Sequence, residues 1–380
     1  MQYFSYLESK IKDDLFYQLP VSFNKFTHKE LLAHSLGALL YTPGTRQDIS
    51  DIIINKKYEG LLSIAICLED SIGESDVESA EKNVIDQLKK LSQYYNGTLS
   101  DLPLIFVRPR NYDQFDKMLN KLNKLELSVL TGFIFPKCSK DSLENYFNLI
   151  KKINLKFSIH LYAMPILETK EIIFVENRIK TLLEIKEVCD RHSQIILNVR
   201  IGATDFSGVY GLRRKPYHSI YDISVINACL SDIINIFGRV EAQYTLSAPV
   251  WEYFSNEKNG KSTFGEVPLN INDSGLIKEL LLDRQNGLSG KTIIHPSHIS
   301  PVNFMQIVEK EDYLDAIMIL DSLKSGGVKK STYENKMNEI NPHKEWAKKI
   351  IAKSNLFGVF EDGYSYKSIF EIDIEKATQL

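Results

Sequence analysis

The chain has few cysteines, and they show no metal-binding or disulfide pattern. The four cysteines among its 380 residues, Cys67, Cys138, Cys189 and Cys229, lie far apart and include no C-x-x-C pair. Residues 1–30 mix acidic and basic side chains among aromatic ones, which is typical of neither a signal peptide nor a transit peptide. Both features predict reduced thiols and a cytoplasmic location.

Long apolar runs and an excess of charge are lacking as well. The longest nearly apolar stretch, 61–68, is far too short to cross a bilayer. Lys and Arg total 46 against 49 Asp and Glu, so the net charge of -3 predicts no nucleic-acid or membrane partner. With 12 prolines, 19 glycines and 43% hydrophobic residues, the composition excludes collagen-like and disordered chains. No Walker loop, G-x-G-x-x-G or H-E-x-x-H motif occurs.

The sequence does contain a repeated alternation of short apolar runs and longer segments with helical spacing. Most of the short runs lack polar/apolar alternation, as expected for parallel strands covered on both faces. Eight strands alternating with amphipathic helices predict an α/β fold, a (β/α)8 TIM barrel, with a doubly wound open sheet as the competitor. The predicted strands are 38–41, 62–68, 104–107, 133–135, 160–166, 195–201, 244–247 and 292–294.

The composition changes near residue 326. Gly326-Gly327 follow a helical stripe, and residues 328–340 are polar and rich in Lys, Asn and Glu, which is typical of a linker. A helix is expected after them. The predicted division is a TIM-barrel catalytic domain at 1–325, with a lead-in helix or arm at 1–34, and a C-terminal helical extension at 326–380 that packs on the barrel or on a neighbouring subunit.

Polar residues follow nearly every predicted strand. In a parallel barrel the C-terminal strand ends meet at one mouth, where active sites lie. Each residue alone would be an ordinary helix cap or a solvated charge, but together they predict a site with carboxylates, arginine, lysine and histidine. The residues are Thr42-Pro43-Gly44, Glu69-Asp70, Arg108 with Arg110, Lys137, Glu168, Asp205, Ser247 and His295-Pro296.

Glu168 and Asp205 follow strands that are adjacent in the predicted barrel. Two carboxylates without companion Cys or His suit a hard divalent cation that keeps several waters, Mg²⁺ rather than Zn²⁺. The alternative is that Glu168 belongs to the first turn of a helix, where the dipole favours an anion, and that Asp205 is an ordinary turn residue.

Arg108 should emerge at the rim, where a guanidinium can bind a carboxylate and stabilise a developing enolate. Its structural alternative is an ion pair with Glu69 or Asp70, and the two roles are compatible. Lys137 is a candidate for a Schiff-base aldolase, although a rim lysine paired with a carboxylate is commoner.

Two further groups have both a functional and a structural interpretation. His295 is a candidate general base or a half-buried structural histidine. The run Arg213-Arg214-Lys215 would contact a phosphate-bearing arm of the substrate, or is simply solvated.

The ordered set of motifs resembles the HpcH/HpaI aldolase and citrate lyase β-subunit family over about residues 35–320. It is most similar to the citrate lyase β-like branch and, within it, to the C–C bond lyase subgroup of bacterial tellurite-resistance-type gene clusters. The motifs are Tyr-Thr-Pro-Gly (41–44), Leu-Glu-Asp (68–70), Val-Arg-Pro-Arg-Asn (107–111), Pro-Lys (136–137), Ile-Leu-Glu-Thr (166–169), Gly-Ala-Thr-Asp-Phe (202–206) and Gly-Lys-Thr-Ile-Ile-His-Pro (290–296).

The resemblance implies a TIM barrel whose C-terminal extension often reaches a neighbouring subunit, and hence a homo-oligomer. Glu168 and Asp205 would be the ligands of Mg²⁺, with Mn²⁺ as a substitute, and Arg108 would bind the substrate's carboxylate or carbonyl. Glu69 and Asp70 would help to place Arg108 and a water molecule. The implied reaction is retro-aldol or retro-Claisen cleavage of a 3-hydroxy acid, a 2-oxo acid or an acyl thioester through a metal-stabilised enolate.

The remaining predicted roles concern the substrate. The base that takes the hydroxyl proton would be Glu69 or Asp70 acting through water, with His295 behind it. The residues expected to contact substrate, besides Arg108, are Pro43, Gly44, Lys137, Ser247 and Arg213.

Several positions depart from the family pattern. Cys67 stands where members commonly have Asp, and His298 stands where Gln is usual. His34-Ser35 replace the arginine associated with coenzyme A, so a coenzyme A thioester as substrate stays an open question. Two alternatives also stay open: the same site used for condensation or thioester hydrolysis, as in malate synthase-like and thioesterase relatives, or a non-catalytic barrel subunit that binds a small acid.

Overall fold

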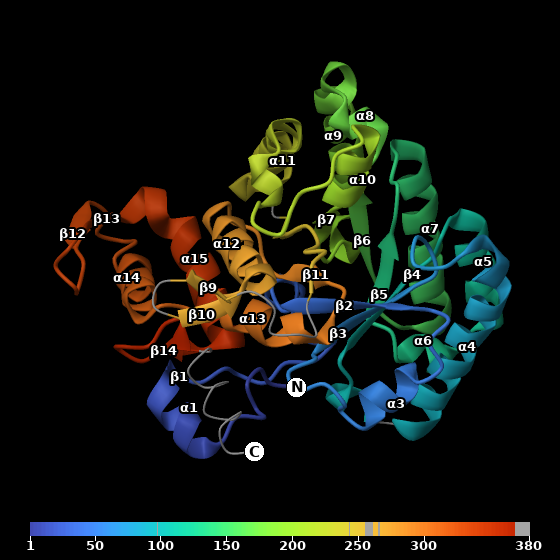
Figure 1. Cartoon of the computed structure of the whole chain (residues 1–380), viewed down its shortest axis with the longest axis horizontal. Helices are drawn as coiled ribbons and strands as arrows, with labels where there is room; N and C mark the ends of the chain where they lie inside the picture. The colour runs from blue at the N-terminus through green and yellow to red at the C-terminus, as the bar shows by residue number, and fades with distance from the viewer. Residues whose placement is uncertain (97, 243, 255–260, 265–266, 369–380) are drawn as a thin grey trace.

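The centre of the molecule is a sheet of eight parallel strands that closes into a barrel (Figure 1). Its order is β11-β2-β3-β4-β5-β6-β7-β8, and a parallel bridge between Ala248 and Lys291 joins the two ends. The predicted TIM barrel is thereby confirmed, and the open sheet is excluded. This computed structural model describes residues 1–96, 98–242, 244–254, 261–264 and 267–368.

All eight apolar runs that predicted strands contribute one strand each to the barrel. Every residue of β3, β4, β5 and β6 is buried, which explains why these runs show no polar alternation. The strands are β2 (Ala38–Pro43), β3 (Ser63–Cys67), β4 (Leu104–Arg108), β5 (Gly132–Phe135), β6 (Tyr162–Leu167), β7 (Val199–Ile201), β8 (Leu246–Ser247) and β11 (Lys291–Ile293).

Successive side chains of each barrel strand point alternately inward and outward. On β4, Phe106 belongs to the cluster that fills the barrel, whereas Ile105 and Val107 pack in the larger cluster beneath the helices. The same alternation turns Arg108 inward, above Phe106. On β7 it turns Arg200 inward, between Val199 and Ile201, which belong to the outer cluster.

Amphipathic helices cover the outside of the barrel (Figure 1). The helical residues between 170 and 191 are divided between two helices, because Phe174 has an extended backbone with φ -74° and ψ 122°. No helix in the described ranges is long and apolar enough to cross a membrane. The helices are α3 (Ile49–Ile54), α4 (Val77–Tyr94), α5 (Tyr112–Lys121), α6 (Lys124–Ser128), α7 (Lys140–Phe157), α8 (Lys170–Ile173), α9 (Val175–Arg191), α10 (Ala203–Val209), α11 (Ser224–Phe237), α12 (Ile271–Gln285) and α13 (Ile299–Phe304).

The first and last described elements lie close together, as the blue α1 and red β14 show in Figure 1. β1 pairs antiparallel with β14, with Phe16 opposite Phe360. The terminal elements are α1 (Ser9–Leu15), β1 (Phe16–Gln18), α2 (Lys29–Leu32), α14 (Lys310–Asp321), β12 (Val328–Lys330), β13 (Met337–Glu339), α15 (Ile340–Phe357) and β14 (Val359–Phe360), and the hairpin β9 (Lys261–Phe264) with β10 (Val267–Asn270) precedes α12.

The segment 328–340, predicted to be a linker, instead forms the antiparallel pair β12–β13, which leads directly into α15. The helical nature of the extension is confirmed by α15. Ala316 of α14 and Ala347 of α15 share one hydrophobic cluster, so the residues before and after position 326 pack together. The domain boundary therefore stays a prediction, and residues 369–380 lie outside the described residues.

Gly358 provides a test of the contact between the chain ends. Its φ is +82°, and a Cβ there would lie 2.7 Å from a ring carbon of Phe16 and 2.8 Å from the carbonyl oxygen of Gln18. We expect Gly358→Ala to lower the free energy of unfolding by roughly 3 kcal/mol or more, because backbone strain and a clash act together.

The matched control is Gly363→Ala. Gly363 has a similar φ of +88° but nothing within 4 Å of the added Cβ, so only the conformational cost of about 1–2 kcal/mol applies. Urea unfolding of both variants measures the difference. Equal losses in the two variants would show that the close contact of Gly358 with Phe16 and Gln18 does not constrain this position.

Candidate functional site at the barrel mouth

A cavity of about 350 Å³ opens at the C-terminal ends of the barrel strands. The polar residues that line it include Asp70, Arg108, Glu168, Arg200 and Asp205. Four of them follow or end β3, β4, β6 and β7, and Arg200 lies within β7, so barrel closure brings together residues that are far apart in sequence. Four of these five were predicted as rim residues, and Arg200 was not.

Arg108 is the centre of the charged contacts in this cavity. Its Nη2 lies 2.7 Å from an oxygen of Glu69, 3.2 Å from Asp70 and 3.4 Å from Glu168. The guanidinium and the carboxylates of Glu69 and Glu168 are almost fully buried, whereas the side chain of Asp70 is 53% exposed. The predicted pairing of Arg108 with Glu69 and Asp70 is therefore present, and Arg108 still faces the cavity.

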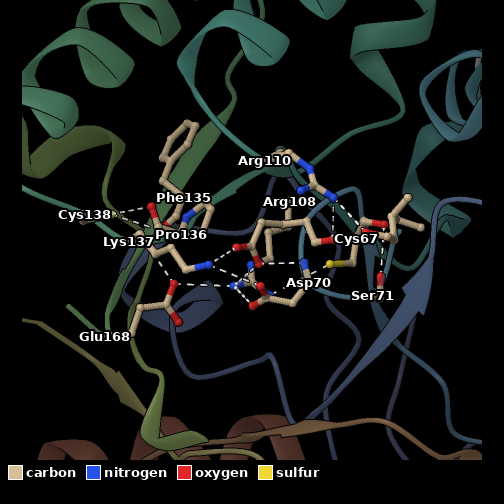
Figure 2. Close-up of polar contacts among 12 residues, drawn as sticks. Cys67, Asp70, Ser71, Arg108, Arg110, Phe135, Pro136, Lys137, Cys138 and Glu168 are labelled. Carbon is tan, nitrogen blue, oxygen red and sulfur yellow. Dashed lines mark hydrogen bonds and ion pairs between the residues drawn. The ribbon is translucent and has the colours of Figure 1, made fainter. Parts of the chain in front are cut away.

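Lys137 completes this network from the end of β5 (Figure 2). Its Nζ lies 2.5 Å from Glu69 and 3.2 Å from Asp70, and its backbone N–H donates to Glu168 at 2.7 Å. Lys137 has φ +48°, a conformation that non-glycine residues adopt at a cost and mostly where the surroundings demand it. In this conformation Lys137 contacts three carboxylates, two through its amine and one through its backbone N–H.

The amine of Lys137 is not suited to Schiff-base formation. Burial alone would lower its pKa, but the contacts with Glu69 and Asp70 outweigh burial and raise the pKa above its usual value. The amine therefore stays protonated at neutral pH, and a protonated amine is not a nucleophile. The geometry favours the carboxylate-paired alternative for Lys137.

Glu168 and Asp205 form a second, less compensated acidic pair. Burial, with a contribution from the nearby carboxylate of Asp205, raises the pKa of Glu168 to about 8, although Arg108 opposes the shift. The pKa of Asp205 is also raised, first by burial and then by Asp70, and Asp205 shares a side-chain hydrogen bond with Glu168. Without a cation, the pair is therefore most stable when it retains a proton.

Gly202 makes the approach of these two residues sterically possible. It precedes α10, which carries Asp205, and it packs directly on the side chain of Glu168. A Cβ at position 202 would lie 2.5 Å from the Cβ of Glu168. The glycine of the Gly-Ala-Thr-Asp motif is therefore required by the packing of Glu168.

The donor set fits a hard divalent cation held in part by water or substrate. Within the described ranges, no three His, Cys, Asp or Glu side chains are grouped so as to hold a metal, which excludes an all-protein cage there. Mg²⁺ is commonly bound through one or two carboxylates and several waters, and both Glu168 and Asp205 line the cavity. A cation there would also relieve the repulsion that raises both pKa values.

Two predicted substrate residues lie behind the cavity wall rather than in it. Pro43 lines the cavity, but Gly44 packs behind β2 against Leu68 and donates its N–H to the carbonyl of Cys67. Ser247 is buried on β8 and donates to a backbone carbonyl.

The two remaining candidates are turned away from the cavity. The ring of His295 stacks on that of Phe254 at 4.4 Å, and its Nδ1 lies 2.8 Å from the hydroxyl of Ser297. Arg213 is exposed and is absent from the cavity lining among the described residues. Its neighbour Arg214 is buried and pairs with Glu279, which favours a structural role for that charged run.

Arg200 was missed because it lies within a strand, not after one. It is 2% exposed and directed into the barrel from β7. The apolar run 195–201 nevertheless contained a signal. Asn198 and Arg200 alternate with the apolar residues around them, a period of two that marks one face of a strand.

The closed (β/α)8 barrel, with acidic residues and arginines around the cavity at its C-terminal mouth, defines a TIM-barrel protein. The chain belongs to the C–C bond lyase family of the TIM-barrel fold, whose family profile matches residues 30–359. The family resemblance of the motifs is thereby confirmed. A comparison with curated protein sequences finds no match.

Solved structures share this fold at low sequence identity. A citrate lyase from Burkholderia xenovorans LB400 has a TM-score of 0.61 and 11% identity, covering 84% of this chain and 91% of that one. CitE from Mycobacterium tuberculosis, in complex with magnesium, acetoacetate and coenzyme A, has a TM-score of 0.53 and 15% identity, covering 85% and 99%. Haloferax volcanii malate synthase, in a magnesium/glyoxylate complex, has a TM-score of 0.51 and 11% identity, covering 76% and 84%.

The raised pKa of Glu168 predicts a pH-dependent loss of stability in EDTA. The folded protein retains a proton up to about pH 8 that the unfolded chain releases near pH 4.5. The unfolding free energy should therefore fall as the pH rises from 5 to 8, by at most about 1.4 kcal/mol per pH unit. The Gln side chain of Glu168→Gln cannot ionise, so this variant should not show the part of the pH-dependent fall in unfolding free energy that comes from Glu168.

Urea unfolding of the wild type and Glu168→Gln at several pH values measures the effect. Glu176→Gln, at an exposed position of α9, is the matched control and should follow the wild type. Parallel pH profiles for the wild type and Glu168→Gln would show that Glu168 is ionised in the folded protein.

Proposed function

We propose that this chain is a Mg²⁺-dependent carbon–carbon lyase that cleaves a 3-hydroxy acid, a 2-oxo acid or an acyl thioester. The observation that carries the proposal is that the buried Glu168 and the half-buried Asp205 line one cavity together with Arg108. Family membership supports the reaction class. The magnesium complexes of CitE and malate synthase, which share the fold, support the choice of metal.

Glu168 and Asp205 would hold the metal. The homo-oligomer and the cytoplasmic location predicted from the sequence remain expectations. When bound, Mg²⁺ supplies positive charge that polarises a substrate oxygen and offsets the negative charge formed as the bond breaks. Glu168 is fixed for this task by the N–H of Lys137 and by the packing of Gly202.

Arg108 would stabilise the developing enolate from the floor of the cavity. Its guanidinium is already oriented by Glu69 and Asp70, so it needs little reorganisation during the reaction. Loss of one such stabilising group commonly costs about 10²–10³ in rate. Because Arg108 also contacts Glu168, it couples the substrate position to the metal ligand.

Asp70 is a better candidate base than His295. Although burial alone would raise the pKa of Asp70, its hydrogen bond with Glu69 and the charges of Arg108 and Lys137 lower it below the usual value. Asp70 is therefore ionised, and it lines the cavity, which His295 does not. The carboxylate of Asp70 would take the substrate hydroxyl proton, directly or through a water molecule.

The size of the cavity favours a small acid as the reacting part of the substrate. Its volume of about 350 Å³ is near the lower end of ligand pockets. A coenzyme A moiety, if the substrate carries one, would lie outside it. The same residues would also serve condensation, the reverse reaction. The fold shared with malate synthase supports this alternative.

Asp205→Ala tests the metal assignment. We expect this variant to lose Mg²⁺ binding and to lower turnover at least about 10³-fold, because both the metal charge and its position are lost. Calorimetric titration with Mg²⁺ and a panel of 3-hydroxy acids and acyl thioesters measure the two effects. Asp86→Ala, at an exposed position in the middle of α4, is the control. Unchanged Mg²⁺ affinity in Asp205→Ala would overturn the assignment.

Borohydride trapping separates this reaction from a Schiff-base aldolase. Because Lys137 is held protonated by two carboxylates, incubation with pyruvate and borohydride should give no covalent adduct. EDTA should abolish turnover completely. Mass spectrometry that finds a pyruvate adduct on Lys137 would contradict the metal-dependent mechanism.

A further inference from the structure

Arg200 stands apart from the other cations of the site because its partners are neutral. Its Nη1 lies 3.2 Å from the hydroxyl of Ser247, and its Nη2 lies 2.5 Å from that of Thr292. The phenol of Tyr41 also contacts the guanidinium. Arg200 lines the cavity together with Tyr41 and Thr292, so this group is directed toward the space that a ligand would occupy.

The charges around the cavity leave Arg200 without an anion. Arg108 and Lys137 each contact two or more carboxylates. In the part of the chain that the structure describes, Arg200 has no ion pair, and the positive charge of Arg108 repels it. The side chain is nevertheless 2% exposed. A buried guanidinium without a counter-ion is costly, so an anion is expected beside it when the site is in use.

We propose that Arg200 binds a second carboxylate of the substrate, so that the substrate is a dicarboxylic acid. This inference rests on the proposed function: one end of the acid lies at Glu168 and Asp205, and the other lies on Arg200. A neutral carbonyl oxygen at Arg200 would leave its charge uncompensated. A carboxylate offsets that charge and matches the planar fork of the guanidinium.

The neighbouring hydroxyls are suited to the same ligand. Thr292 and Tyr41 line the cavity beside Arg200, and each can donate a hydrogen bond to a carboxylate oxygen. Ser247 is turned behind Arg200 and fixes the guanidinium by accepting its hydrogen bond. The predicted involvement of Ser247 with the substrate thus becomes an indirect one, through Arg200.

The test compares two four-carbon acids that differ only in the second carboxylate, malate and 2-hydroxybutyrate. Calorimetry in the presence of Mg²⁺ should show that the wild type binds malate at least about 10-fold more tightly, as expected for hydrogen bonds to a charged group. Arg200→Gln should bind both acids equally, with its Mg²⁺ affinity unchanged within about threefold. Arg200→Lys should keep part of the preference, because an ammonium retains the charge but not the fork.

Thermal unfolding separates a binding role from a structural one. Without ligand, Arg200→Gln should be no less stable than the wild type, because it removes an unpaired buried charge while still reaching the hydroxyls of Ser247 and Thr292. Malate should raise the unfolding temperature of the wild type but not of the variant. A large loss of stability in Arg200→Gln, together with a retained preference for malate, would overturn the inference.

Failure of this inference and failure of the proposed function give different results. If Mg²⁺ binds but the wild type does not prefer malate, or binds neither acid, the role of Arg200 is wrong and the metal assignment stands. If Mg²⁺ does not bind but the malate preference depends on Arg200, the lyase proposal fails and the dicarboxylate site stands.

Discussion

The barrel mouth depends on how four carboxylates are kept within one small volume. Glu69, Asp70, Glu168 and Asp205 would repel one another strongly if all were ionised and unpaired. Arg108 contacts three of them, and Lys137 contacts two through its amine and a third through its backbone. These two cations therefore determine which acids stay charged.

The two cations compensate the negative charge of Asp70 more fully than those of Glu168 and Asp205. This difference suits the carboxylates to different roles in the site. Asp70 keeps a lowered pKa because its hydrogen bond with Glu69 and the charges of Arg108 and Lys137 outweigh its burial. Glu168 and Asp205 keep raised pKa values because burial is the largest influence on both, and a neighbouring carboxylate adds to it, Asp205 for Glu168 and Asp70 for Asp205. An ionised carboxylate suited to proton transfer thus stands beside a pair that gains most from a bound cation.

The fold and much of the site could be predicted because both follow from strand burial. A parallel strand covered on both faces produces an uninterrupted apolar run, so the eight strands were visible, and the polar residue after each run marked the mouth. This reasoning found Glu168 and Asp205. It could not find Arg200, whose inward direction depends on the alternation within β7, nor the packing that turns His295 onto Phe254.

The misjudged segments share a physical cause, which is that their partners are distant in sequence. The polar segment 328–340 has no apolar stripe of its own, yet its backbone pairs as β12 and β13. Arg213 and Arg214 are adjacent arginines in one basic run, so the sequence alone does not show which of them is buried. Only the fold places Glu279 of α12 against Arg214 and leaves Arg213 exposed.

Arg214 illustrates how such a distant contact reaches the site. Its guanidinium packs over the ring of Trp251, and its Nε lies 3.3 Å from Glu252. The other oxygen of Glu252 accepts a hydrogen bond of 3.0 Å from Thr204, the residue before Asp205. A buried arginine outside the cavity is thus linked, through two side chains, to the first turn of α10. Arg214, from the segment between β7 and β8, and Glu252, which follows β8, therefore brace the helix that presents one of the two proposed metal ligands.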